Sequence, residues 1–146
     1  MVSPPNLKGQ AMKIKTSDLI DQALDWAVGS CINPNSNPLW PYGRISWSPL
    51  WKQYSIPDEK NAALRVPWTP STNWAQGGPI IEREGITIKA PFDGAIHRKF
   101  KDGSPRWGAN KGVAATASGP TALIAIMRCF VASKLGDEVD VPEELL

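Results

Sequence analysis

The chain has few of the residues that bind metals or act as nucleophiles. Its 146 residues include two cysteines, Cys31 and Cys129, and one histidine, His97. The cysteines do not form a metal motif, and Cys129 lies in an apolar helical pattern, where a thiol is usually a core residue. The chain carries no Ser-His-Asp set, nucleophile elbow or nucleotide-phosphate loop. The sequence therefore predicts a protein without metal or cofactor that is not an enzyme.

Long apolar runs are also absent. No stretch approaches the ~18 consecutive apolar residues of a membrane-spanning helix, and no secretory signal is visible. We therefore expect that the protein has no membrane partner and is located in a reducing cytosol. The length suits one domain, which can bury about 70% of its unfolded surface without a metal or a disulfide. We expect this α+β domain to span residues 12–146, after a disordered extension over residues 1–11.

The net charge is only +2, but it is unevenly distributed. Residues 136–146 contain five acids and no base, which leaves 16 bases against 9 acids, or +7, in the rest of the chain. Residues 86–111 contain six bases and two acids. This excess suits either a phosphate-bearing ligand or a solvated sheet face. It is too sparse for duplex DNA, so we do not expect nucleic acid as a partner.

Capping residues and apolar periodicity predict a first and a last helix. The first is expected to be capped by Thr16 or Ser17 and to stop at Gly29. The last, "TALIAIMRCFVASKL", is expected between Pro120 and Gly136, and its apolar residues on nearly every side predict burial.

Between these helices the sequence predicts strands and one long excursion. Residues 86–89, "AIHRKF", a segment from Trp107 and "GVAATASG" are expected to form a small antiparallel sheet with a hairpin turn at Asp102-Gly103. Val139 and Val141 are expected to add an edge strand. Residues 33–70, rich in Trp and Pro, are expected to form an ordered excursion packed by its own rings, with a short strand in "GRISW". The resulting fold class is α+β, a small antiparallel sheet covered by helices as in an α/β sandwich.

The stretch "PSTNWAQGGPIIERE" is the strongest candidate for a binding site. It predicts a loop over residues 71–78 and a short helix over residues 79–84, or alternatively a longer helix that begins near Asn73. The hydroxyl and amide side chains would supply hydrogen bonds, Trp74 would stack a base, the glycines would allow close approach, and nearby bases would bind phosphates. Alternatively, the hydroxyls cap the helix, Trp74 fills the core and the glycines form a turn. The candidate ligand-binding residues are Ser71, Thr72, Asn73, Trp74, Gln76, Gly77, Gly78, Arg83, Arg98 and Lys99.

Arg128 stands out in the apolar last helix. A guanidinium there must reach a partner or water. We expect an ion pair with Glu82, Glu84 or an acid of the C-terminal segment; an anion-binding role is the alternative.

Three fragments together resemble the NinX family of small tailed-bacteriophage proteins: "ALDWAV", "PSTNWAQGGPIIERE" and "GPTALIAIMRCFVASKLGDEVDVPEEL". The resemblance covers the first helix and most of residues 70–145, and excludes residues 33–66. The family pattern has Asp at the position of Asn73 and Pro at that of Ala122, so this chain lacks a loop carboxylate. The resemblance implies a phage accessory protein in the cytoplasm of a bacterial host, and it implies no reaction.

Three hypotheses about function follow. The protein binds and sequesters a nucleotide-derived signal of host immunity, without catalysis, and a homo-oligomer would suit such a site. Alternatively, it inhibits a host protein through the Trp-rich excursion, where aromatic side chains are typical interface anchors. In the third hypothesis it is a structural or replication accessory without a ligand.

Overall fold

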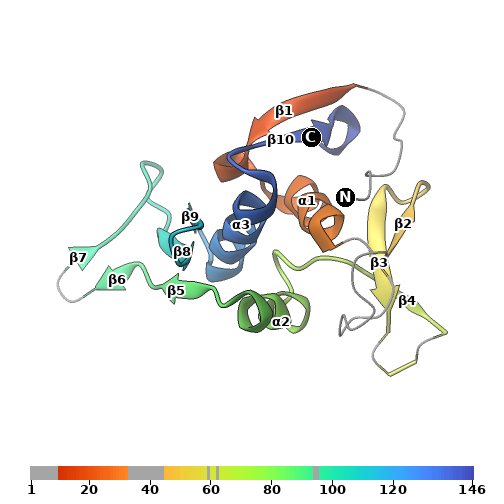
Figure 1. The fold of residues 1–146 in the computed structure, drawn as a ribbon, viewed down its shortest axis with the longest axis horizontal. Helices are drawn as coiled ribbons and strands as arrows, with labels where there is room; N and C mark the ends of the chain where they lie inside the picture. The colour runs from red at the N-terminus through yellow and green to blue at the C-terminus, as the bar shows by residue number, and fades with distance from the viewer. Residues whose placement is uncertain (1–9, 33–44, 59, 62, 94–95) are drawn as a thin grey trace.

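The structure, a computed structural model, describes residues 10–32, 45–58, 60–61, 63–93 and 96–146 (Figure 1). The α+β class is confirmed. The helices are α1 (Asp21–Ile32), α2 (Trp74–Glu84) and α3 (Ala122–Leu135), with 3-10 turns at Thr16–Asp18 and Glu143–Leu145. The strands are β1 (Ala11–Lys15), β2 (Ser46–Ser48), β3 (Gln53–Pro57), β4 (Arg65–Pro67), β5 (Thr87–Lys89), β6 (Phe92–Asp93), β7 (Ile96–His97), β8 (Trp107–Lys111), β9 (Ala115–Gly119) and β10 (Glu138–Pro142).

The strands are divided among several small antiparallel sheets rather than gathered in one. Two sheets have three strands each, in the orders β2-β3-β4 and β5-β8-β9. β1 pairs with β10, and β6 pairs with β7. The second sheet confirms that residues 86–89, the segment from Trp107 and "GVAATASG" belong to one sheet. The prediction that "AIHRKF" joins them is wrong, because its residues Ile96–His97 pair with β6 instead. A turn follows Phe100, whose N–H donates to the carbonyl of Ser104 at 2.9 Å, as the Asp102-Gly103 signal predicts.

Helix α3 is the centre of the hydrophobic core. It packs on β8 and β9 and against α1 (Figure 1), and Ala125, Ile126 and Val131 have no exposed surface. The Thr121 hydroxyl caps its first turn by accepting a hydrogen bond from the N–H of Ile124 at 3.1 Å. The helix ends before Gly136, so its predicted bounds and burial are confirmed.

The predicted bounds of the first helix are wrong. α1 begins at Asp21, and Thr16 lies in a separate turn, where its hydroxyl donates to the Gly136 carbonyl at 2.6 Å. Gly29 does not stop the helix. It faces the ring of Tyr54 so closely that a Cβ there would lie 2.5 Å from the ring. Glycine is therefore needed at this position for packing, not for a turn.

The predicted loop over residues 71–78 is wrong beyond its first residues, and the longer helix is the correct alternative. Asn73 caps α2, with its side-chain oxygen accepting from the N–H of Ala75 at 3.0 Å. Gly77, Gly78 and Pro79 all lie inside the helix, which ends at Gly85 with φ at 64°.

Residues 46–67 of the excursion form the β2-β3-β4 sheet, of which the sequence predicted only the strand in "GRISW". The rings of Trp47 and Tyr54 meet edge to face at 5.1 Å, as expected for an excursion packed by its own rings. Residues 33–44 lie outside the described part of the chain.

The two ends of the described chain meet in one ribbon. β10 contains Val139 and Val141, as predicted, and it pairs with β1. Because β1 starts at Ala11, the structured chain begins before Met12, and the predicted boundary of the extension is wrong at residues 10 and 11. The rest of that extension, residues 1–9, lies outside the described residues.

Arg128 makes no ion pair with Glu82, Glu84 or a described acid of the C-terminal segment, contrary to prediction. It is buried, and its guanidinium donates to the carbonyls of Leu19 at 2.8 Å and Ser118 at 2.9 Å. Burial lowers the pKa of Arg128 and nearby Asp18 raises it, yet an arginine stays charged in proteins. The carbonyl dipoles stabilise the positive charge, and these hydrogen bonds tie α3 to the segment before α1 and to β9.

Asp25 in α1 is a buried acid that makes stability depend on pH. Its carboxylate accepts a hydrogen bond from the N–H of Ser71 at 2.9 Å, but burial dominates and raises its pKa from 3.8 to about 6. The folded state therefore holds this proton more tightly than the unfolded chain. The stabilisation is fully present below pH 3.8 and is lost as the pH rises through about 6.

We expect Asp25→Asn to remove this loss. The amide keeps an oxygen for Ser71 but cannot ionise, so the variant should gain up to about 3 kcal/mol over the wild type as the pH rises across this range. Urea unfolding from below pH 3.8 to above pH 6 measures the difference. A difference that does not change with pH would contradict the assignment.

Candidate functional site

A basic pocket lies between an extended arm, residues 90–93 and 96–106, and the sheet β5-β8-β9. It has a volume of about 340 Å³, and its lining includes Arg98, Lys99, Arg106, Trp107 and Ser118. No acidic side chain is among the described residues that line this arm pocket. Three cations, one indole and one hydroxyl therefore face a single concavity.

The hairpin geometry of the arm brings these cations together. The N–H of Arg106 donates to the carbonyl of Arg98 at 3.1 Å, and the backbones of Lys99 and Pro105 form an isolated antiparallel β-bridge. The guanidinium of Arg106 lies over the Phe100 ring, 5.5 Å from its centre. These contacts position the side chains from both sides of the turn.

Arg98 keeps a hydrogen-bond donor unused. One of its terminal nitrogens donates to the carbonyl of Ala90 at 2.6 Å, which fixes the side chain. Its Nε is buried and has no hydrogen-bond partner within the described part of the chain. A buried charged donor without a partner is costly.

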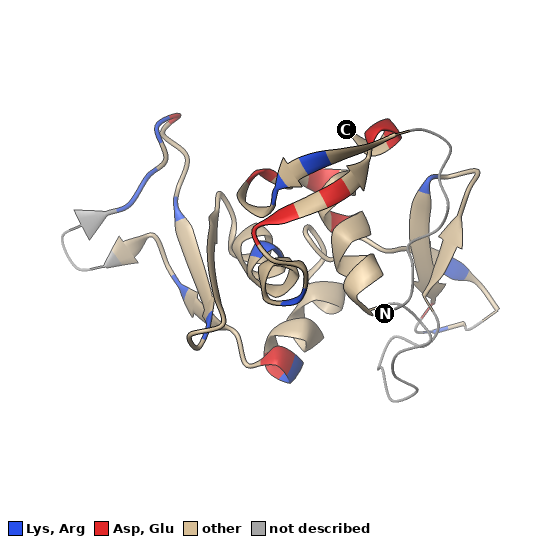
Figure 2. Cartoon of the chain, turned by 45° about the horizontal axis from the view of Figure 1, so that its top comes forward, with Lys and Arg blue, Asp and Glu red and all other residues tan. Residues whose placement is uncertain are grey.

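The charge distribution separates the arm from the opposite ribbon (Figure 2). Blue residues predominate along the arm, which also carries red at its tip, and along the neighbouring sheet, whereas red residues follow β10 and the C-terminal turn. Lys13 of β1 pairs with Asp140 of β10 at 3.4 Å and with Glu138 at 3.9 Å. These pairs are exposed and contribute little stability, but the ribbon repels anions that the arm attracts.

The predicted site residues do not meet in one pocket. Arg98 and Lys99 line the arm pocket, and none of residues 71–78 does. Ser71 is buried and binds Asp25, Asn73 caps α2, and Gln76 is buried and bridges the backbone of Pro67 and Thr69. These side chains hold the start of the helix.

The other predicted site residues lie on the surface or in the contact between α2 and α3. Trp74 is 55% exposed, so it neither fills the core nor lines the arm pocket. Thr72 is exposed, and Arg83 is exposed in the last turn of α2. Gly77 is buried against α3, whereas a Cβ at Gly78 would meet nothing within 4 Å.

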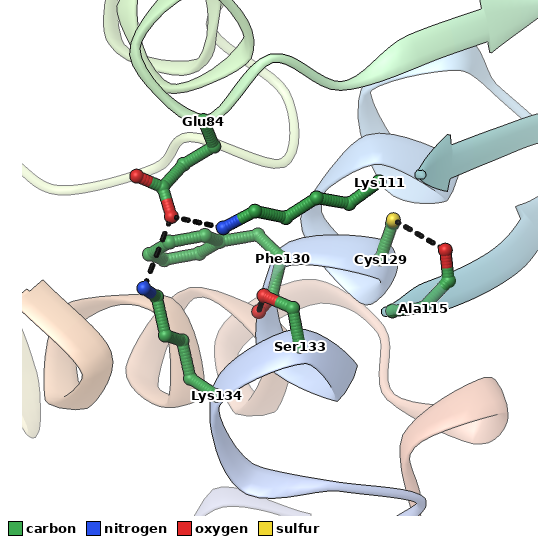
Figure 3. A network of polar contacts seen from close by, with 7 residues as sticks. All are labelled: Glu84, Lys111, Ala115, Cys129, Phe130, Ser133 and Lys134. Carbon is green, nitrogen blue, oxygen red and sulfur yellow. Dashed lines mark hydrogen bonds and ion pairs between the residues drawn. The ribbon is translucent and has the colours of Figure 1, made fainter. Parts of the chain in front are cut away.

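Glu84 at the end of α2 is the centre of an ion-pair network (Figure 3). One of its oxygens contacts the ammonium groups of Lys111 at 3.0 Å and Lys134 at 3.2 Å. Burial raises the pKa of Glu84, but the hydrogen bonds from the two lysines outweigh burial, and the pKa is lowered overall. The network joins α2, β8 and α3, which makes it a structural contact.

The cysteines are poor nucleophiles in this environment. Burial raises the pKa of Cys31 to about 12, despite the attraction of Lys134, so the thiol stays protonated at neutral pH. Cys129 is buried beside the carbonyl of Ala115, and burial raises its pKa as well. His97 lies in β7, and its side chain is outside the described part of the structure.

Two further observations concern function classes. Among the described residues, no group of three or more His, Cys, Asp and Glu side chains could hold a metal ion. No helix in the described ranges is both long and apolar enough to cross a membrane.

Arg106 and Trp107 are the site residues that the sequence analysis missed. The signal was present, because a hairpin turning at Asp102-Gly103 places Arg106 opposite Arg98. The role of Ser118 could not be found this way, since it depends on the packing of β9 beside β8.

Comparison with known proteins identifies the family. The family described as "Bacteriophage P22, NinX" matches residues 15–134, and the chain therefore belongs to it. No curated protein matches the chain.

Proposed function

We propose that this NinX family protein binds a nucleotide-derived signal of host immunity in the arm pocket and sequesters it without catalysis. The observation that supports the proposal is the pocket itself, which three cations and Trp107 line together. Arginine and lysine bind phosphate oxygens, and an indole stacks on a base. Such a protein would act in the cytoplasm of the bacterial host, and a homo-oligomer would enclose the ligand further.

The pocket replaces the loop of residues 71–78 as the proposed binding surface. The loop residues that would have made hydrogen bonds are already engaged in capping and packing α2. Arg98 and Lys99 remain from the predicted set, and Arg106 and Trp107 join them.

Isothermal titration calorimetry of the full chain against cyclic and linear nucleotides tests the proposal. We expect at least one phosphorylated compound to bind and Arg106→Glu to weaken it roughly tenfold or more, because a charge-assisted contact is lost. Gly108→Leu should also block binding, since a Cβ there meets Lys89 only at 3.5 Å and the new side chain extends from the pocket wall. The bound compound should be recovered chemically unchanged.

The control is Lys60→Glu, which makes the same charge change at an exposed position away from the arm pocket. If it weakens binding as much as Arg106→Glu, the attraction is nonspecific and the pocket has no role. If no nucleotide binds, the proposal is contradicted, and the hypothesis of an accessory protein without a ligand is favoured.

Inhibition of a host protein is the second candidate, and the tip of the β2–β3 hairpin favours it. Leu50 is 84% exposed and Trp51 is 73% exposed, beside a groove of about 480 Å³ on the β2-β3-β4 sheet. Trp47 is not such an anchor, because it packs on Tyr54. This candidate is preferred if a host partner recovered by the wild type is lost with Trp51→Ala and kept with Trp74→Ala.

A further inference from the structure

A second pocket is lined in part by residues Thr116 and Ala117 of β9. It has a volume of about 230 Å³, and Ser17, Thr116, Ala117, Asp137 and Glu138 are among the residues that line it. These residues come from the turn before α1, from β9 and from the chain entering β10. We call it the β9 pocket.

The β9 pocket and the arm pocket adjoin. Ala117 lines both of them, while its neighbours Thr116 and Ser118 line one each. β9 is an edge strand of its sheet, and a ligand that fills both pockets would have to follow this edge. Two residues of a strand span about 7 Å, a distance comparable with that between a nucleotide's phosphate and its sugar or base.

The two pockets have opposite chemistry. The arm pocket has three cations, whereas the β9 pocket has two carboxylates, hydroxyls and one ammonium, from Lys15. Carboxylates accept hydrogen bonds from N–H and O–H groups and repel phosphate. A ligand that fills both therefore carries its anionic group at one end and its hydrogen-bond donors at the other.

We infer that the two pockets form one composite site for an intact nucleotide, with phosphates in the arm pocket and sugar hydroxyls or base amino groups in the β9 pocket. The inference rests on the proposed function. It adds the orientation of the bound nucleotide and a preference for compounds that carry a nucleoside. A phosphate group alone would occupy only the arm pocket. Asp137 and Glu138 are the residues that distinguish a nucleotide from a simple phosphate.

The test compares adenosine 5′-diphosphate, guanosine 5′-diphosphate and inorganic pyrophosphate by calorimetry. Removing a negative charge near an anionic ligand should tighten binding if only long-range electrostatics acts. The composite site predicts the opposite for nucleotides: Asp137→Asn with Glu138→Gln should weaken the better-bound nucleoside diphosphate roughly tenfold. Pyrophosphate should bind the variant equally or more tightly. Both side chains are exposed, so the variant should fold.

The matched control is Asp140→Asn, an exposed acid on the same ribbon that does not line the β9 pocket. It should not weaken any of the three compounds. Equal affinity of the wild type for pyrophosphate and both nucleotides, no binding of either nucleotide, or tighter nucleotide binding in the carboxylate variant would overturn the composite site. The proposed function fails separately, if the wider nucleotide panel does not bind or does not depend on Arg106.

Discussion

Replacing Arg128 by methionine is expected to destabilise the protein by roughly 2–5 kcal/mol. The side chain is 7% exposed, and its two hydrogen bonds reach carbonyls far apart in the sequence, at Leu19 and Ser118. Methionine would retain much of the volume but leave both carbonyls without this donor. Each buried group without a partner costs about 1–3 kcal/mol, partly offset because the variant no longer buries a charge. Urea unfolding followed by tryptophan fluorescence gives the change in free energy.

Arg128→Lys is the matched control for this prediction. It retains the charge but cannot direct two donors to separate carbonyls from a planar group, so its stability should lie between those of wild type and Arg128→Met. A methionine variant as stable as the wild type would show that the cost of burying the guanidinium equals the strength of its two hydrogen bonds.

The same residue shows what limits prediction from sequence. The conflict between an arginine and an apolar helix was visible, but its partners were expected among acids. The actual partners are backbone carbonyls, which every residue carries and no composition reveals. Asp25 is similar, since its partner is the N–H of Ser71, 46 positions away.

Elements whose signals are local were predictable. α3 has its cap at Thr121, its stop at Gly136 and a continuous apolar run between them, so nothing distant was needed. The hairpin at Asp102-Gly103 is local as well. α1 was misplaced because Thr16, a good capping residue, binds the backbone of Gly136 instead. Tertiary contacts thus overrode a correct local preference.

The residues of the candidate site also differ in whether local sequence signals or tertiary contacts determine their roles. Charge in the sequence indicated Arg98 and Lys99, and the turn could have indicated Arg106. The loop of residues 71–78 combined features of binding sites and of helix starts, and sequence alone could not separate these. Tertiary contacts decide it, because Gly77 is buried against α3 and Gln76 is buried against the backbone of Pro67 and Thr69.

The adjacent glycines of α2 should respond in opposite ways to the same substitution. A Cβ at Gly77 would lie 2.6 Å from Leu123 Cδ2 and 2.8 Å from the Pro70 carbonyl oxygen. The leucine can move, but the backbone oxygen belongs to the segment that enters the helix. We therefore expect Gly77→Ala to destabilise the protein by about 1–3 kcal/mol, as overpacking does, even though alanine favours helices. Urea unfolding again provides the measurement.

Gly78→Ala is the matched control, because it changes the same residue type one position later in the same helix. A Cβ there meets nothing within 4 Å, so only the backbone preference remains, and we expect stabilisation of about 0.5–1 kcal/mol. Equal effects at both positions would contradict the close contact between α2 and α3. Opposite signs would show that Gly77 serves the packing of α2 on α3 rather than the close approach of a ligand.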